Sequence, residues 1–390
     1  MKSQWVLLLG IFLASPMALA WSEHHLVTAA ALRDLSELNT RVTAPTDFRD
    51  LLRALGYASE VEFNEAILIN KNYRFAPKLK ETPGTPLRAV DVLTMYSDEP
   101  DWGMDENLFS DDQYPQLWRP EYTMMGGRTG LPSRAFRHMY WEKLDWLQPI
   151  KTLKLPFSKL FSPMGQAPER AAVFVDLSRR AKKAGQDYWS LRFLADALHY
   201  LEDCSQPFHT TQVPTKRFML LPFGHLGNGL HGYVKQMTNV ISYYHFSFED
   251  YVAHLMLDAD AQGASSVEGQ RLNDALAENL SQPRELSYDD EDISKTVIAM
   301  AKIAVRKAPE AARASLAFFP KSPMPFMNLP AGDPEVYLTQ VETADWWKDV
   351  VARGKQDTPA ERAYFKVVES VFSPLGFAVW KVVRGELMNN

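Results

Sequence analysis

Cysteine is almost absent from this sequence of 390 residues, in which Cys204 is the only example. A disulfide within the chain is therefore excluded, and stability must come from packing, which a chain of this length can supply. The sequence also lacks the polar–apolar alternation typical of half-buried strands, and it has neither internal repeats nor low-complexity segments. Helical periodicity is the pattern that remains.

Long hydrophobic runs are scarce, and the one at the N-terminus, Val6 to Ala14, is too short to span a membrane comfortably. It follows Lys2 and precedes Ala18-Leu19-Ala20, which has the small-x-small form that signal peptidases cut. We therefore expect residues 1–20 to be a signal peptide and the protein to be exported, either secreted or periplasmic. Cleavage after Ala20 would make Trp21 the first residue of the mature chain.

An excess of positive charge is also missing, because 42 basic residues face 48 acidic ones. Loss of Lys2 with the signal peptide changes the formal net charge from −6 to −7. This balance argues against a surface that binds duplex nucleic acid by neutralising phosphates. A small phosphoester site remains compatible with it, because bound metal ions bring their own positive charge.

Apolar residues at helical spacing predict an all-α fold. A first helix begins near His25, and its apolar positions are Ala31, Leu35 and Leu38. Further helices are predicted over residues 51–55, 171–185, 188–203, 293–319 and 360–387, with interruptions or kinks at Pro309 and Pro374. We expect one helical domain over residues 21–320, followed by a C-terminal helical extension over residues 321–390 that packs on the same core.

The chemistry-bearing residues concentrate in residues 198–209. His199 and Asp203 are four residues apart, so on a helix they share one face. Pro207 then stops the helix, and the chain can turn His209 back toward the same region. This spacing by itself is more often a structural contact, but two imidazoles and a carboxylate brought together also suit Zn²⁺.

The pattern His-Tyr-x-x-Asp-x-x-x-Pro-x-His at residues 199–209 resembles the signature of the bacterial zinc-dependent phospholipases C, which are related to fungal single-strand nucleases. In that family the mature protein begins with a tryptophan whose amino group and carbonyl oxygen bind zinc. Trp21, at the predicted cleavage point, matches this feature. The resemblance implies a helical bundle of the phospholipase C type and three bound Zn²⁺ ions.

The resemblance also implies ligands along residues 21–255, assigned by matching the family pattern position by position. It assigns Asp101, His138, His199 and Asp203 to one ion, Trp21, His25 and a bridging Asp203 to a second, and His209, His245 and Glu249 to a third.

Two of these assignments have competitors in the sequence. His24 competes with its neighbour His25 for the second ion, and His231 competes with His245 for the third. His245 is preferred because Glu249 follows at a spacing of four, whereas the residue four after His231 is a lysine.

The chain departs from the family pattern beside the bridging aspartate. Glu202 stands where the family usually has glycine or threonine, and its carboxylate could either point to solvent or crowd the site. Cys204 also follows the ligand directly, but at that position it should point away from the ligand face and act as a small apolar side chain.

The resemblance implies a hydrolase of lipid degradation: a phospholipase C that converts phosphatidylcholine-like glycerophospholipids at a membrane or micelle surface to diacylglycerol and a phosphorylated head group. Asp101 and Asp203 are the expected catalytic residues, Asp101 as a general base and Asp203 as the bridging ligand. We expect a monomer.

Two other functions stay open. The first is a zinc-dependent single-strand nuclease or 3′-nucleotidase, for which Trp102 could stack on a base. The pair His245 and Glu249, the Pro100-Asp101 pair and the apolar residues 218–223 favour lipid instead. The second is a non-catalytic helical protein that binds zinc for structure.

Overall fold

The structure is a computed structural model. It describes residues 23–45, 47–76, 82–106, 108, 136–142, 163–211, 214–220, 229–262, 266–277, 283, 285–289, 291–319, 345–354 and 356–388. The predicted signal peptide and Trp21 lie outside these residues.

Every long element in the described part of the chain is an α-helix, which confirms the all-α prediction at the level of fold class. The helices are α2 (His24–Leu32), α3 (Phe48–Leu55), α4 (Glu60–Ala66), α5 (Ala89–Tyr96), α8 (Ala167–Lys183), α9 (Asp187–Asp203), α10 (Lys216–Leu220), α11 (Gly229–Gln262), α12 (Val267–Ala277), α13 (Ile293–Phe318), α15 (Asp345–Gly354) and α16 (Pro359–Met388). Three short 3-10 helices accompany them in the described part of the chain: η1 (Ser36–Asn39), η2 (Glu99–Asp101) and η6 (Pro207–His209).

A small antiparallel sheet, which the sequence pattern did not predict, joins β1 (Arg41–Thr43) to β2 (Pro86–Arg88). Val42 is paired with Leu87 at its centre. Each strand has only three residues, which are too few to show polar–apolar alternation, so no periodic pattern indicated these segments.

Helix boundaries follow local chemistry in some places and tertiary packing in others. The predicted helix over residues 51–55 is α3, and Gly56 ends it in the left-handed conformation that glycine adopts without strain. The first helix is shorter than predicted, since α2 ends at Leu32. Leu38, expected on the same helix, is buried but belongs to η1. Helices α13 and α16 continue through Pro309 and Pro374, so neither proline divides its helix.

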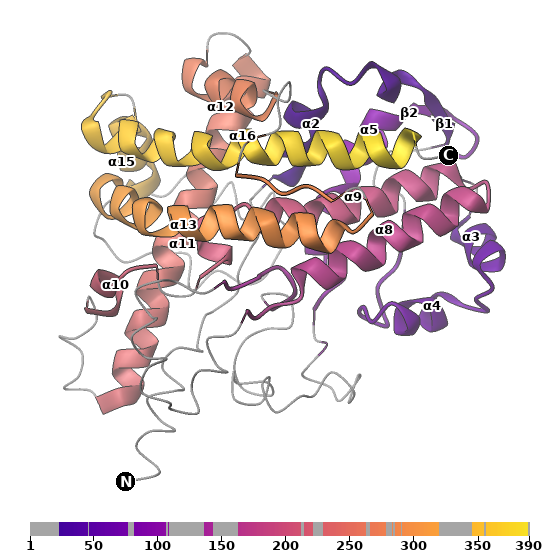
Figure 1. The fold of residues 1–390 in the computed structure, drawn as a ribbon, viewed down its shortest axis with the longest axis horizontal. Coiled ribbons are helices and arrows are strands. Elements are labelled where there is room, and N and C mark those ends of the chain that lie inside the picture. Colours follow the sequence, from indigo (N-terminus) through magenta and orange to yellow (C-terminus); the bar gives the residue numbers. More distant parts are fainter. Residues whose placement is uncertain are drawn as a thin grey trace.

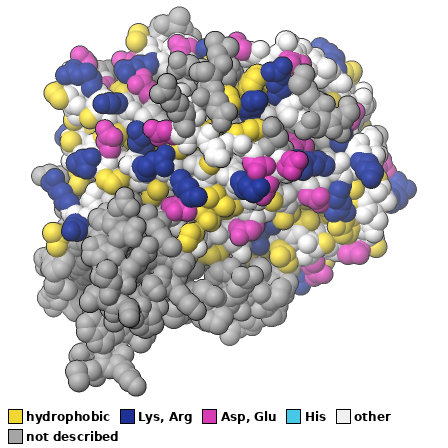
Figure 2. All heavy atoms as spheres, viewed as in Figure 1, with side chains coloured by type: hydrophobic (Ala, Val, Ile, Leu, Met, Phe, Trp, Pro, Cys, Tyr) yellow, Lys and Arg dark blue, Asp and Glu magenta, His cyan; other side chains and the backbone are white. Residues whose placement is uncertain are grey.

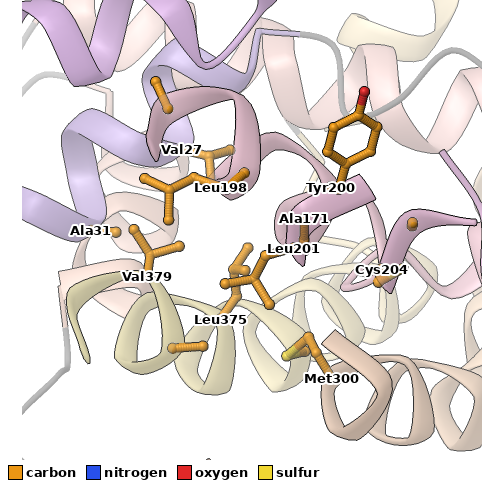
Figure 3. Packing of buried hydrophobic residues seen from close by; sticks show 14 of the residues in the cluster. Val27, Ala31, Ala171, Leu198, Tyr200, Leu201, Cys204, Met300, Leu375 and Val379 are labelled. Carbon is orange, nitrogen blue, oxygen red and sulfur yellow. The ribbon is translucent and has the colours of Figure 1, made fainter. Parts of the chain in front are cut away.

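Helix α9 is the central element, because every one of its residues after Asp187 is buried. It forms a hairpin with α8, which lies beside it, and α5 and α16 also contact it (Figure 1). Gly185 closes the hairpin with φ 70°, a conformation that side chains disfavour. Figure 3 shows side chains from α2, α8, α9, α13 and α16 meeting in one core: Val27, Ala31, Ala171, Leu198, Leu201, Met300, Leu375 and Val379.

The C-terminal helix α16 belongs to this core. It packs against α13, α12 and α2, and Val371, Leu375 and Val379 are fully buried in the same hydrophobic cluster as Leu198 of α9. Because α2 is held between α16 and α5, the C-terminal part of the chain helps to place the start of α2 beside the end of α9.

The outer surface has no strongly basic region on the face in view: basic and acidic side chains are interspersed over its described part (Figure 2). Among the described helices, none combines the length and hydrophobicity needed to cross a membrane.

Candidate metal centre

Histidine and carboxylate side chains converge at the C-terminal end of α9. They come from the start of α2, from η2, from residues 136–142, from α9 itself, from η6 and from the middle of α11. Ligand-type atoms lie within 4.8 Å of one another in three groups that are buried or nearly so: His24, Asp101 and His199; His138, His199 and Asp203; and His209, His245 and Glu249.

The first predicted ligand set is brought together. Oδ2 of Asp203 lies 3.0 Å from Nδ1 of His138 and 3.3 Å from Nε2 of His199. Oδ1 of Asp101 lies 3.6 Å and 3.8 Å from the same two nitrogens. Asp101 is the most accessible of the four, with 18% of its side chain exposed, whereas the other three are fully buried.

The third predicted set is also brought together. Oε1 of Glu249 lies 2.8 Å from Nε2 of His245 and 3.1 Å from Nε2 of His209. Gln206 donates an amide hydrogen bond of 2.8 Å to the same oxygen. The side chain of the competing residue, His231, lies outside the described side chains.

The second set differs from the prediction, because His24 rather than His25 faces the centre. His24 is fully buried, and its Nε2 lies 3.7 Å from Oδ1 of Asp203. His25 keeps 32% of its side chain exposed, and its Nδ1 lies 3.1 Å from Glu23 and 2.8 Å from Asp98. Successive residues of a helix point about 100° apart, so a choice between neighbours depends on how α2 is rotated in the core.

Asp203 occupies the middle of the centre. Its Oδ2 faces His138 and His199, while its Oδ1 lies 3.7 Å from Nε2 of His24 and 3.5 Å from Nδ1 of His209. One carboxylate therefore reaches members of all three groups.

Each of four imidazoles is held through one ring nitrogen by a fixed partner outside the centre. Nδ1 of His199 contacts the carbonyl oxygen of Ser97 at 2.7 Å, and Nδ1 of His209 contacts that of His138 at 2.9 Å. Nδ1 of His24 lies 2.7 Å from Oε2 of Glu202, and Nε2 of His138 lies 3.3 Å from Oδ2 of Asp105. Partners of this kind orient metal-binding histidines and set their tautomers.

Backbone contacts fix the segment that carries His138. Tyr140 and Glu142 donate backbone hydrogen bonds of 3.2 Å and 2.9 Å to the carbonyl oxygens of His209 and Thr210. On the other side the segment packs against Gly165, where a Cβ would lie 1.9 Å from the carbonyl oxygen of Met139. A larger residue at position 165 would displace the segment and His138 with it.

Asp105 and Glu202 were not predicted as site residues. Asp105 is buried and accepts hydrogen bonds of 2.9 Å from Arg137 and 2.6 Å from Tyr200. Burial acts to raise the pKa of Asp105, but the positive charges of Arg137 and Arg170, together with His138, outweigh it and hold this pKa well below its usual range. Asp105 carried no sequence signal, and Glu202 stood out only as a departure from the family pattern, because each acts through a histidine that is distant in the chain.

Burial dominates the electrostatics of the imidazoles. Burial, reinforced by the neighbouring histidines, lowers the pKa of His24 well below its ordinary value, and burial lowers that of His245 to about 3. Burial also acts to lower the pKa of His138, but the carboxylates of Asp203 and Asp105 outweigh it and raise the pKa to about 9.

The carboxylates respond to burial in the opposite sense. Burial raises the pKa of Asp203, although His199 and His138 partly oppose it, and burial raises that of Glu249 well above its usual range. Burial favours the neutral form of His24 and His245 and opposes the charged form of the carboxylates beside them, so a cation would relieve the cost of burying these carboxylates.

Orphaned polar atoms support the same conclusion. Both carboxylate oxygens of Asp203, Nε2 of His24 and Oε2 of Glu249 are buried without a hydrogen-bond partner. Buried polar atoms are rarely left this way in proteins. Asp203 also ends α9, where the helix dipole is negative and favours a positive charge. The residues therefore fit divalent metal ions.

Other residues singled out in the sequence take structural positions. Cys204 is a buried free cysteine, as predicted. Phe218, the first residue of the apolar stretch, packs in the core against Phe208 and Tyr244, while Leu220 is 59% exposed. Residues 221–223 lie outside the described residues.

No protein-family model matches the chain, and no curated protein or solved structure matches it. The fold and the centre therefore define its class directly: it is an essentially all-helical protein with three buried His/Asp/Glu groups that could hold metal ions.

Proposed function

We propose that this protein is an exported zinc-dependent phosphodiesterase, and specifically a phospholipase C. The observation that carries the proposal is the position of Asp203, whose two oxygens face histidines of different groups. A carboxylate shared in this way is typical of catalytic sites with several metal ions, whereas structural zinc is usually enclosed by four ligands of its own. The resemblance of residues 199–209 to the phospholipase C signature supports the same assignment.

The donor atoms favour zinc over magnesium or calcium. Five histidines and three carboxylates supply the ligand-type atoms of the three groups, and imidazole suits zinc, whereas magnesium and calcium prefer oxygen alone. In the proposal, His24 takes the place that the family pattern gave to His25. When bound, zinc supplies Lewis acidity toward a phosphoryl oxygen and lowers the pKa of a bound water to about 7.

The chain contributes positioning and a proton acceptor. His138 and His199 are buried and held from outside the centre by Asp105 and the Ser97 carbonyl, so they can bind without rearrangement. Asp101 lies beside both histidines but is partly exposed, which allows it to meet a substrate or water at the edge of the centre. We assign Asp101 the role of general base, which removes the proton of the attacking water.

Lipid is the preferred substrate. Glu249, not an aspartate, joins His209 and His245, which matches the phospholipase form of the pattern. Leu220 is exposed two residues after Phe218, which is buried against Phe208 of η6, so an apolar side chain is available for contact with a lipid surface. The protein would act at a membrane or micelle surface.

A single experiment tests the class. The purified mature protein is incubated with phosphatidylcholine vesicles and, separately, with single-stranded RNA, each with and without a chelator, and bound metal is counted. Chelator-sensitive release of diacylglycerol with intact RNA supports the proposal. Cleavage of RNA alone would assign the protein to the nucleases. Bound zinc with no hydrolysis of either substrate would make it a zinc-binding protein without catalysis.

A further inference from the structure

Glu202 is a buried carboxylate beside the central Asp203 and has no role in the proposed chemistry. It points neither to solvent nor into the centre: its Oε2 lies 2.7 Å from Nδ1 of His24, and its Oε1 accepts a 2.7 Å hydrogen bond from the hydroxyl of Thr28. Thr28 lies one turn after His24 on α2, so the carboxylate bridges two successive turns of that helix.

We propose that Glu202 is a positioning residue that holds the proton of His24 on Nδ1 and so presents Nε2 to a metal ion. The proposal deepens the proposed function and rests on it for the metal. Nε2 of His24 is buried without a hydrogen-bond partner and lies 3.7 Å from Oδ1 of Asp203. The two side chains could therefore hold one ion together.

The hydroxyl of Thr28 fixes the orientation of the Glu202 side chain. Because Oε1 of Glu202 already accepts from Thr28, the carboxylate is fixed in rotation and turns Oε2 toward the imidazole. His199 and His209 are held by neutral backbone carbonyls instead. The partner of His24 is instead a side chain that is itself held by Thr28, and this contact fixes the ring so that Nε2 stays turned toward Asp203.

Glu202 also accounts for the choice between the two adjacent histidines. His25 is paired with Asp98 at 2.8 Å, a contact of the same kind, but on the outward side of α2 where both side chains are partly exposed. The carboxylate partner of His24 is carried by α9, so α2 and α9 must be packed together before His24 is oriented.

The first test measures the tautomer of His24 in the metal-free protein by NMR of the imidazole nitrogens. The proton is expected on Nδ1 in the wild type and in Glu202→Gln, whose amide oxygen still accepts it. In Glu202→Leu, which removes the acceptor, a mixture of tautomers is expected. A wild-type proton on Nε2, or a Glu202→Leu spectrum identical to the wild type, would overturn the proposal. The wild-type spectrum decides even if Glu202→Leu does not fold.

The second test measures zinc affinity by competition with a coloured chelator. Glu202→Leu should lower the affinity for one zinc ion by roughly 10- to 100-fold, the usual effect of losing an outer partner of a ligand. Glu202→Gln should keep most of the wild-type affinity. Asp98→Asn, which removes the carboxylate partner of His25, is the matched control and should leave affinity unchanged. Equal affinity of the wild type and Glu202→Leu would contradict the proposal.

These outcomes separate the inference from the proposed function. A wild-type protein that binds no zinc but carries the His24 proton on Nδ1 would refute the metal function and leave the positioning role of Glu202 intact. If the wild type binds three ions and Glu202→Leu binds them equally well, the positioning role of Glu202 is refuted and the metal function is kept.

Discussion

Oδ2 of Asp203 lies 3.0 Å from Nδ1 of His138, although Asp203 ends the central helix α9 and His138 belongs to a separate segment anchored to η6. The other oxygen of Asp203 faces His24 and His209. The carboxylate thus stands between histidines from four different segments, and its loss should affect more than one metal ion.

Asp203→Asn should lower the number of bound zinc ions and reduce phosphodiester turnover by more than about 100-fold, because losing even an outer partner of a ligand costs about 10- to 100-fold. An amide keeps the shape of the side chain but removes its negative charge. Metal content and turnover are measured on the same preparation. Unchanged values of both would exclude the bridging role.

His24→Ala and His25→Ala form a matched pair on adjacent residues of α2. His24→Ala should remove one zinc ion, because His24 is buried and faces Asp203, whereas His25→Ala should leave the metal content as in the wild type. Metal analysis after gel filtration provides the measurement. Loss of an ion in His25→Ala alone would restore the assignment made from the sequence.

Metal removal should destabilise the fold, because the buried carboxylates of Asp203 and Glu249 lose their compensating charge. Free zinc at about 100 times the dissociation constant of one site should add about 2.7 kcal/mol to the free energy of unfolding. Thermal unfolding with chelator and with added zinc measures the difference. A midpoint that does not depend on zinc would argue against binding to the folded state.

The metal-free protein should lose stability in acid through His245, whose pKa burial lowers from 6.5 to about 3. Between these values the unfolded chain binds a proton that the folded chain does not, so the free energy of unfolding falls as the pH falls. One such group contributes at most about 1.4 kcal/mol per pH unit. Chemical denaturation at pH 7, 6 and 5 tests this, and His245→Leu should show a smaller slope.

His138 acts in the opposite direction and in a different pH range. Its folded pKa is raised to about 9, so its contribution to stability is present below pH 6.5 and is lost as the pH rises toward 9. The contributions of His245 and His138 to stability are therefore largest together near neutral pH. Stability that kept rising from pH 7 to 9 would contradict this assignment.

Arg192→Leu should destabilise the protein by about 3–5 kcal/mol, because it leaves the carboxylate of Glu99 buried and uncompensated. Arg192 donates two hydrogen bonds of 2.6 Å to Glu99, in η2, the short helix that also contains Asp101. Denaturant unfolding measures the loss, and adding Glu99→Gln to Arg192→Leu should recover part of it. A double variant no more stable than the single one would show that the ion pair is not the cause.

Sequence reasoning predicted the long helices well because their periodicity is local and strong. The predicted helices at residues 188–203 and 293–319 agree with α9 and α13 within a residue. It failed where tertiary contacts override local rules: α2 stops at Leu32, although the apolar spacing continues to Leu38. Of the interruption or kink predicted at Pro374, the structure excludes the interruption, because α16 runs through this residue. The short sheet of β1 and β2 was not predicted, because its strands are too short to show a periodic pattern.

The sequence by itself determined the helical class and the histidines and carboxylates available at motif spacing, since helical faces and short-range spacings are properties of neighbouring residues. Only the tertiary structure decided that His24 rather than His25 faces Asp203, and that Glu202 and Asp105 hold histidines from the outside. These choices depend on the rotation of α2 against α9 and on contacts between residues far apart in the chain. Such contacts are set by the packing of the whole core.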